Sequence, residues 1–275
     1  KEIKKIYVDS ISVTNKYKYL DLFLKSSVFD DRIIISLTSW EKRLNNLPQV
    51  LDTLLKQSVK PYKIIINLSC EEFPNKELDL PISLINFLKL HILIEINWVE
   101  KNTKVWKKII PTLNNYSTDI IIGVDDDFIY PSDMLKTFLE KHKNFPENPI
   151  SGSFGIFNGK HCHCGCASFT RFVFMQGYID YIESDILDSG SSDIFYTFIT
   201  NLNGFNYQIL PKQFFNNMVS YNSNDGYSAG RSKNIVNNTY QLLSKKFGLN
   251  KSITNNASVP IDTAKKSLTN FYNNE

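Results

Sequence analysis

The sequence predicts an α/β fold in which a mostly parallel β-sheet is flanked by helices. Two patterns predict it: short β-branched runs alternate with amphipathic helical segments from residue 32 onward, and the strand-like runs are almost continuously apolar. Such runs are typical of parallel strands that helices cover on both faces. A chain of 275 residues with 42% hydrophobic and 13% aromatic residues is also large enough to fill the core of such a domain.

The first strand–helix–strand unit lies at residues 32–68. Residues 32–37 (RIIISL) form an apolar run that predicts a buried strand. Residues 47–55 repeat leucine and valine at helical spacing, and Pro48 suits the first turn of this helix. Residues 63–68 (KIIINL) then predict the second strand, so the connection between the two strands is a helix.

The same alternation continues to residue 124. A short helix near 82–88 leads to a third strand at 92–98. Apolar residues at helical spacing mark a further helix at 105–113, and residues 119–124 (DIIIGV) predict a fourth strand. This strand leads directly into three aspartates.

The second half of the chain is less regular. A helix is expected from Ser132, which suits its N-cap, to about residue 143. Residues 146–190 are rich in glycine and show no clear period, whereas residues 193–202 and 235–247 return to helical spacing.

Polar residues follow three of the predicted strands, at residues 38–40, 69–71 and 125–127. Ligands of open parallel sheets bind beyond the carboxyl ends of the strands. We therefore expect these three segments to meet at one site.

The composition excludes several classes of protein. The 31 basic residues exceed the 28 acidic ones by only three, which does not favour a nucleic-acid-binding protein. Four cysteines are too few for a disulfide scaffold, so we expect reduced thiols and a cytoplasmic location. No membrane span or signal peptide is predicted, and the first residue is not methionine, so the sequence is compatible with a fragment. Membrane contact at the inner face is then at most peripheral, through pairs such as Lys245–Lys246 and Lys265–Lys266.

The acidic triplet Asp125–Asp127 is the strongest chemical signal. Adjacent carboxylates repel one another, whereas Mg²⁺ and Mn²⁺ prefer oxygen ligands and share them with substrate phosphates. Strand geometry predicts that Asp125 and Asp127 point the same way and Asp126 the other. The alternative interpretation is a solvated acidic turn without chemistry.

Three blocks around this triplet resemble the GT-A class of nucleotide-sugar glycosyltransferases. They are residues 33–69 (IIISLTSWEKRLNNLPQVLDTLLKQSVKPYKIIINLS), 104–113 (KVWKKIIPTL) and 119–131 (DIIIGVDDDFIYP). The likeness covers about residues 31–210 and is greatest to bacterial family-2-like enzymes that build capsular or lipopolysaccharide glycans. It implies a GT-A-like (Rossmann-like) domain, a nucleoside-diphosphate sugar as donor, with a UDP-sugar first, a glycan or lipid-linked glycan as acceptor, and Mn²⁺ or Mg²⁺ as cofactor.

The resemblance also implies a division of the chain. An N-terminal extension at 1–30 precedes a GT-A-like catalytic domain at 31–215, and a flexible lid loop with a C-terminal helical tail follows at 216–275. The lid is expected at residues 220–233, which are rich in Ser, Asn and Gly; Arg231 there is expected to pair with the donor diphosphate. A disordered connector is the alternative.

The resemblance assigns donor-binding roles to the matching residues Thr38, Ser39, Arg43, Glu71, Lys104, Lys108, Asp125 and Asp126. Asp125 lies on the ribose or sugar side, and Asp127, with Asp125, binds the metal. Each position has a plainer interpretation. Thr38 and Ser39 could cap the next helix, the three cations could be solvated, and Glu71 could belong to loop surface.

Asp193 is the candidate catalytic base. Inverting transfer needs a carboxylate that takes the proton of the acceptor hydroxyl, and the resembled enzymes carry it at the start of a helix behind the metal motif. Here the stretch is SGSSDIFYTF, with Ser192 where the family has a first carboxylate. The helix N-terminus is expected to lower the pKa of Asp193. The alternative is an ordinary helix cap.

Histidine and cysteine alternate at residues 161–166 (HCHCGC), which suggests zinc. A single tight run does not easily surround a tetrahedral ion, so an acceptor-side loop with His163 as a contact is the preferred interpretation. Two further function classes stay open: a nucleotidyl- or phosphotransferase, disfavoured because no glycine-rich phosphate loop is present, and a non-catalytic glycan- or zinc-binding module.

Overall fold

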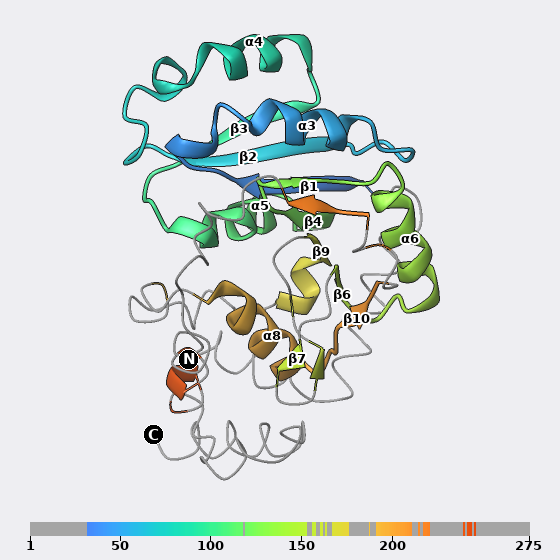
Figure 1. The fold of residues 1–275 in the computed structure, drawn as a ribbon. Coiled ribbons are helices and arrows are strands. Elements are labelled where there is room, and N and C mark those ends of the chain that lie inside the picture. The colour runs from blue at the N-terminus through green and yellow to red at the C-terminus, as the bar shows by residue number, and fades with distance from the viewer. Residues whose placement is uncertain are drawn as a thin grey trace.

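The computed structural model describes residues 32–117, 119–152, 156–157, 160–161, 163, 167–175, 187, 191–210, 214, 217–220, 239, 241–243 and 245. Its centre is a seven-stranded sheet with the order β10-β6-β9-β4-β1-β2-β3 (Figure 1). The strands are β1 (Ile33–Thr38), β2 (Lys63–Ser69), β3 (Ile94–Val99), β4 (Ile120–Val124), β6 (Ile150–Ser151), β9 (Ala167–Thr170) and β10 (Gln208–Ile209).

The sheet has a parallel part and a mixed part. Strands β4, β1, β2 and β3 pair in parallel, and Ile35 of β1 lies opposite Ile64 of β2 and Ile122 of β4. Strand β9 is antiparallel to both β4 and β6, and β10 is parallel to β6. Two short ribbons complete the strands: β5 (Phe128–Ile129) pairs with β11 (Val219–Ser220), and β7 (Ile156–Phe157) pairs with β8 (Lys160–His161).

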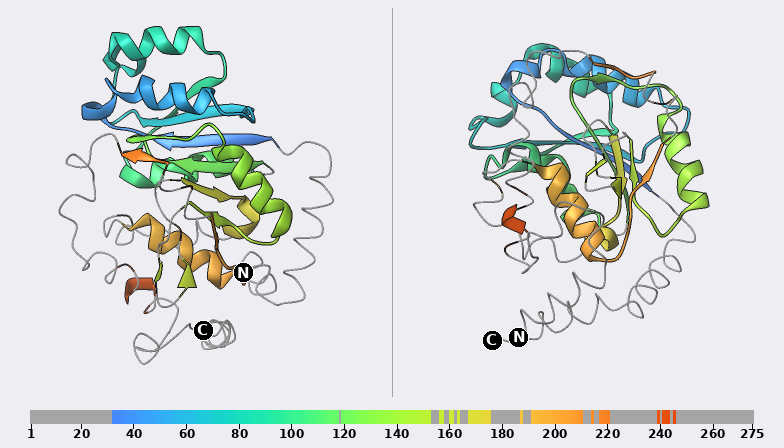
Figure 2. Two further views of the ribbon diagram at one scale, coloured as in Figure 1. Left: turned by 45° about the vertical axis from the view of Figure 1, so that its right-hand side comes forward. Right: turned by 60° about the horizontal axis from the view of Figure 1, so that its bottom comes forward.

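Helices cover both faces of the sheet because successive side chains of a strand point to opposite faces. Ile33 and Ile35 of β1 belong to the core that also contains α3 (Leu47–Leu55), α4 (Ile82–Leu90) and α6 (Met134–Asn144). Ile34 belongs to the core on the other face, with η3 (Lys104–Lys108), α5 (Ile110–Asn115) and α8 (Ser192–Leu202). Figure 2 shows these layers from two further directions. Three single turns, η1 (Glu41–Arg43), η2 (Lys76–Asp79) and η4 (Phe172–Met175), lie in the connections.

The structure confirms the predicted fold class and corrects two details. The helix expected at 105–113 is a 3₁₀ turn, η3, followed by the short helix α5, with Pro111 near the start of the latter. Helix α6 has Asp133, not Ser132, at its N-cap, because residues 132–133 still form a turn.

Several expectations concern residues outside the described ones. They are the extension at 1–30, the lid loop beyond Ser220 with Arg231, most of the helix at 235–247 and the last 25 residues. Among the residues that are described, no helix combines the length and the apolar character that crossing a membrane needs.

Candidate active site

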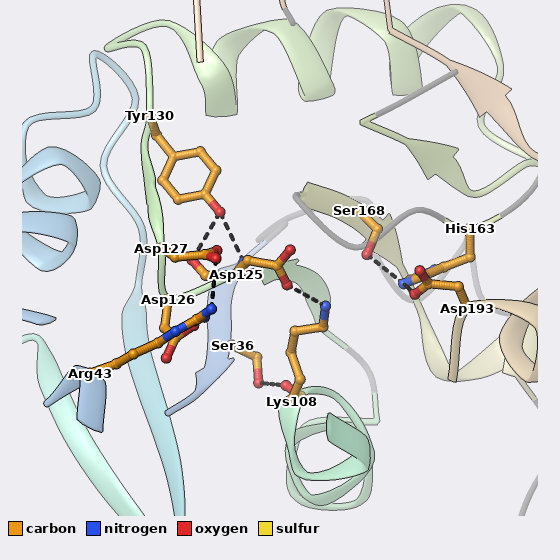
Figure 3. A network of polar contacts seen from close by, with 10 residues as sticks. All are labelled: Ser36, Arg43, Lys108, Asp125, Asp126, Asp127, Tyr130, His163, Ser168 and Asp193. Atoms are coloured by element: carbon orange, nitrogen blue, oxygen red, sulfur yellow. Dashed lines mark hydrogen bonds and ion pairs between the residues drawn. The ribbon is translucent and has the colours of Figure 1, made fainter. Parts of the chain in front are cut away.

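The three adjacent carboxylates lie in a turn at the carboxyl end of β4 (Figure 3). The Tyr130 hydroxyl accepts a hydrogen bond from the Asp125 N–H (2.9 Å) and donates one to the Asp125 carbonyl (3.0 Å), which fixes the backbone of the turn. The side chains of Asp125, Asp126 and Asp127 are 30%, 8% and 16% exposed. The middle carboxylate is therefore the most buried. The expected strand alternation of the triplet does not apply, because β4 ends at Val124; Asp126 and Asp127 share one cationic partner, whereas Asp125 has another.

One guanidinium pairs with two of these carboxylates. Arg43 lies in η1, directly after β1, and its Nη1 contacts Asp126 Oδ1 while its Nη2 lies 3.0 Å from Asp127 Oδ2. The Ser39 hydroxyl donates to Asp126 Oδ2 at 2.6 Å. Both Ser39 and Arg43 are buried, so Arg43 is not a solvated charge and Ser39 faces the acidic turn instead of capping a helix.

The third carboxylate pairs with Lys108. The two groups, Lys108 Nζ and Asp125 Oδ1, are 2.7 Å apart, and the lysine side chain is only 8% exposed. The residue after Lys108 packs closely on β4: a Cβ atom on Gly123 would lie 2.8 Å from Ile109 Cδ1. Glycine at residue 123 thus leaves room for the Ile109 side chain next to Lys108.

A buried row of polar side chains holds η3 and α5 on the sheet. The Asn67 amide of β2 donates to the Thr112 hydroxyl of α5 (3.0 Å) and to the Ser36 hydroxyl of β1 (3.1 Å). The Ser36 hydroxyl donates to the Lys108 carbonyl, and Asn97 of β3 donates to Asn67 Oδ1 (2.7 Å). Because buried polar groups are costly without partners, these bonds fix where η3 presents Lys108.

Asp193 approaches the acidic turn from the first turn of α8. Its side chain is 38% exposed, and its Oδ1 lies 3.9 Å from His163 Nε2. Its carboxylate interacts electrostatically with Lys108 and Asp125 across the site. The structure therefore brings the predicted base to the same site as the predicted metal ligands (Figure 3).

Burial dominates the protonation of the site. Desolvation raises the pKa of Asp193 to about 6. The negative charge of Asp125 also raises this pKa, whereas the positive charge of Lys108 lowers it. The prediction that the helix N-terminus lowers this pKa was wrong, because the loss of solvent outweighs the helix dipole. Burial and the Asp125 charge likewise raise the pKa of Asp127 to about 6, against the attraction of Arg43.

The site has an excess of negative charge. The carboxylates of Asp125–Asp127 and Asp193 face two cationic side chains, Arg43 and Lys108. Burial lowers the pKa of His163 well below its usual value, so the imidazole adds no positive charge. The donor set and the charge excess fit a divalent cation of the Mn²⁺ or Mg²⁺ type. In the described part of the chain no three acidic, His or Cys side chains form a complete metal site.

Three predicted donor contacts lie away from the acidic turn. The Thr38 hydroxyl donates to the Asn67 carbonyl at 2.7 Å, so it joins β1 to β2. Glu71 is exposed and accepts a hydrogen bond from the Asn102 N–H at 2.7 Å. Lys104 is also exposed, with a positive φ of 53°. Roles for these residues in donor binding stay predictions, and Arg231 lies outside the described residues.

Sequence reasoning missed a second buried lysine beside the site. Lys107 is 2% exposed, and its Nζ lies 3.1 Å from Glu72 Oε2 and also contacts Asn102. The sequence offers only an adjacent Lys pair and an adjacent Glu pair, which gives no reason to choose Lys107 over its neighbours. Tyr130, Ser168 and Tyr207 were also missed, since hydroxyl residues in strands and loops carry no distinctive pattern.

His163 is the one residue of its Cys/His run whose side chain is described. The imidazole is 1% exposed, with Nδ1 3.2 Å from the Tyr207 hydroxyl and Nε2 3.1 Å from the Ser168 hydroxyl. These partners do not favour a zinc ligand, and the burial does not favour direct contact with an acceptor. Cys162, Cys164 and Cys166 lie outside the described residues.

Comparisons with known proteins found likeness in structure alone: no protein-family model matches the chain, and no curated protein does so by sequence. S. aureus TarS 1–349 in complex with UDP-GlcNAc is similar with a TM-score of 0.56 at 10% identity, over 88% of this chain and 72% of that one. A second crystal structure of S. aureus TarS 1–349 is similar with a TM-score of 0.54 at 11% identity, over 88% of this chain and 71% of that one.

A second protein is similar over almost the whole chain. The mannosyltransferase PcManGT from Pyrobaculum calidifontis, in complex with GDP-Man and Mn²⁺, gives a TM-score of 0.51 at 13% identity, over 99% of this chain and 86% of that one. At such low identity the likeness establishes architecture. The chain thus has the GT-A-type α/β fold of these glycosyltransferase structures.

Proposed function

We propose that the chain is a metal-dependent glycosyltransferase that moves a sugar from a nucleoside-diphosphate sugar to an acceptor hydroxyl. One observation carries the proposal: Asp193, from α8, lies within electrostatic range of Lys108 and Asp125, on the side of the site across from the paired carboxylates at the carboxyl end of β4. Ligands of open α/β sheets bind at this edge. The fold is shared with structures that contain UDP-GlcNAc or GDP-Man with Mn²⁺, which supports the same class of donor.

Asp127 and Asp125 are the proposed metal ligands. Both are more exposed than Asp126, whose carboxylate is held by Ser39 and Arg43. A divalent ion at these oxygens would offset the negative charge that develops on the departing nucleoside diphosphate. Arg43 and Lys108 hold the carboxylates in place, and they supply positive charge beside the donor phosphates.

Asp193 is the proposed general base. Its carboxylate accepts the proton of the acceptor hydroxyl while the acceptor oxygen forms a bond to the anomeric carbon. The bond from that carbon to the diphosphate oxygen breaks in the same step, so the configuration inverts. A pKa of about 6 leaves Asp193 ionised at neutral pH and more basic than an ordinary aspartate, which suits this task.

We further propose a UDP-sugar as donor and a glycan or lipid-linked glycan as acceptor, in the synthesis of surface polysaccharide. This finer assignment is supported by the resemblance of the three sequence blocks, and Thr38, Glu71, Lys104 and Arg231 are its proposed further donor contacts. A cytoplasmic location at the inner face of the membrane agrees with such a reaction.

The test is donor hydrolysis and transfer by the purified chain. UDP-GlcNAc and GDP-Man are supplied with Mn²⁺, and release of the nucleoside diphosphate is measured with and without a chelator. We expect release with at least one donor and its loss on chelation. Asp52→Asn, at an exposed carboxylate of α3, is the matched control for Asp127→Asn. Release that neither chelation nor Asp127→Asn reduces would contradict the proposal.

A further inference from the structure

Lys108 combines an anchored backbone with a charge on a flexible side chain. The Ser36 hydroxyl of β1 donates to the Lys108 carbonyl and also contacts the Thr112 hydroxyl of α5 at 2.6 Å. The lysine side chain is a flexible carbon chain with a compact ammonium at its end. That ammonium lies 2.7 Å from Asp125 Oδ1. The ammonium can therefore change partner while the backbone of η3 stays in place.

The other cation of the acidic turn is held differently. The Arg43 guanidinium is planar and spans two carboxylates, with Nη1 on Asp126 and Nη2 3.0 Å from Asp127. To move away, Arg43 must leave both carboxylates at once. Lys108 has no such fork, and rotation about the bonds of its side chain is enough to separate it from Asp125. Of the two cations, Lys108 is the one suited to exchange.

Asp125 is accessible to an entering cation although it is paired. Its side chain is 30% exposed, whereas that of Lys108 is 8% exposed. Asp125 is also one of the proposed metal ligands, so a divalent ion there would lie beside the ammonium. Positive charges that share one carboxylate repel one another, and burial strengthens the repulsion. Lys108 in this position therefore opposes binding of the ion that its partner is proposed to hold.

We propose that Lys108 is an exchangeable counter-ion, which pairs with Asp125 until the diphosphate of the donor offers it another anionic partner. This inference rests on the proposed function, which places metal and diphosphate at this turn. With the metal ion alone, the ammonium weakens binding. With the nucleoside diphosphate present, the ammonium turns to the phosphates and leaves Asp125 to the ion. Lys108 thus makes each ligand raise the affinity of the other, by the same factor in both directions.

Calorimetry tests this exchange without turnover. Lys108→Met removes the charge and keeps an apolar side chain of similar length. Without nucleotide, we expect Mn²⁺ to bind about 10-fold more tightly to the variant than to the wild type, within the usual range of coupling between sites. In saturating Mn²⁺, whichever of UDP and GDP the wild type binds should bind about 10- to 100-fold more weakly, because a charge-assisted contact to phosphate is lost. A simple phosphate contact predicts the second change without the first.

Two further variants are matched controls. Lys107→Met removes the adjacent buried lysine, whose Nζ lies 3.1 Å from Glu72 Oε2 and also contacts Asn102. It should leave the affinity for Mn²⁺ close to that of the wild type. Lys108→Arg keeps the positive charge and should therefore keep the lower Mn²⁺ affinity of the wild type.

A crystal structure of the wild type with Mn²⁺ and the bound nucleotide gives a result that does not depend on how any variant folds. We expect Lys108 Nζ within hydrogen-bond distance of a phosphate oxygen and no longer paired with Asp125. An ammonium that still contacts Asp125 in that complex would overturn the proposal.

The outcomes separate this inference from the proposed function. Unchanged or lower Mn²⁺ affinity in Lys108→Met, or an equal rise in Lys107→Met, would overturn the exchange and leave the proposed function standing. A wild type that binds no Mn²⁺, with or without nucleotide, would refute the metal-dependent function and the exchange with it. Absence of sugar transfer, together with the expected changes in both affinities, would count against the proposed reaction and support the exchange.

Discussion

The two sides of the site surround their carboxylates differently. Desolvation and the charge of Asp125 raise the pKa of both Asp127 and Asp193 to about 6. Asp127 has a cationic partner, the Arg43 guanidinium at 3.0 Å, whereas Asp193 is acted on by two charges of opposite sign, those of Lys108 and Asp125. In the proposed function the paired turn holds the metal ion. At Asp193 the attraction of Lys108 is opposed by the Asp125 charge, and in the proposed function this carboxylate takes up a proton, so two carboxyls of similar acidity serve two different tasks.

Substitution of the base should give the largest effect. Asp193→Asn removes the proton acceptor and is expected to lower kcat by about 10²- to 10⁴-fold. Binding of the nucleoside diphosphate with Mn²⁺, measured by calorimetry, should stay close to that of the wild type, because the amide preserves the shape of the side chain. A comparable loss of nucleotide affinity would place Asp193 on the donor side instead and remove the contrast.

Substitution of Asp127, in the acidic turn, should weaken metal binding. Asp127→Asn is expected to lower kcat by about 10²- to 10³-fold, since the charge on the leaving group loses its stabilisation. Unlike Asp193→Asn, it should weaken Mn²⁺ binding, which titration of the ion followed by calorimetry measures. Undiminished Mn²⁺ affinity in Asp127→Asn would contradict the assignment of this carboxylate as a ligand.

Arg43, which pairs with Asp126 and Asp127, should contribute to the free energy of unfolding. Arg43→Gln leaves Asp126 and Asp127 without their cation and is expected to lower the free energy of unfolding by about 3 kcal/mol, measured by urea denaturation. Lys56→Gln breaks the exposed pair with Asp52 and serves as the control, with an expected loss within about 0.5 kcal/mol. Equal losses in the two variants would show that the Arg43 pair acts as a surface pair.

The smallest expected effect is that of pH on the wild type. Asp193 must be ionised to act, so at saturating donor and Mn²⁺ kcat should fall about tenfold per unit below pH 6. The contribution of this carboxyl to folding has the opposite sign: a pKa above the ordinary value means that the folded state gains stability as pH falls from about 6 toward the ordinary value. A pH-independent kcat between 5 and 7 would contradict Asp193 as the base.

The sequence predicted the parallel half of the molecule well because its signals are local. Continuous apolar runs at β1, β2 and β4 and the leucine spacing of α3 determine which face each residue buries. The position of Asp125–Asp127 follows from the strand before them. Resemblance to a family supplied the role of Asp193, and the structure places that residue near Lys108 and Asp125.

The remaining half depends on contacts between segments far apart in the chain. Strands β6 and β10 have two residues each, too few to show a period, and their order in the sheet follows from pairing with β9. The raised pKa of Asp193 depends on burial by the whole fold, which overrides the local effect of the helix terminus. The surroundings of His163 combine residues from β9, α8 and the segment before β10, and no local pattern predicts that combination.

The row of Ser36, Asn67 and Thr112 has a consequence for how such sequences can vary. Each of the three is fully buried and forms hydrogen bonds with the other two. Replacing one alone by an apolar residue therefore leaves polar atoms of its neighbours without a hydrogen-bond partner. We expect homologues either to retain all three or to exchange them jointly for an apolar set. The position of Lys108 would then be preserved during evolution by correlated substitutions at these three buried residues, although none of the three belongs to the proposed substrate contacts.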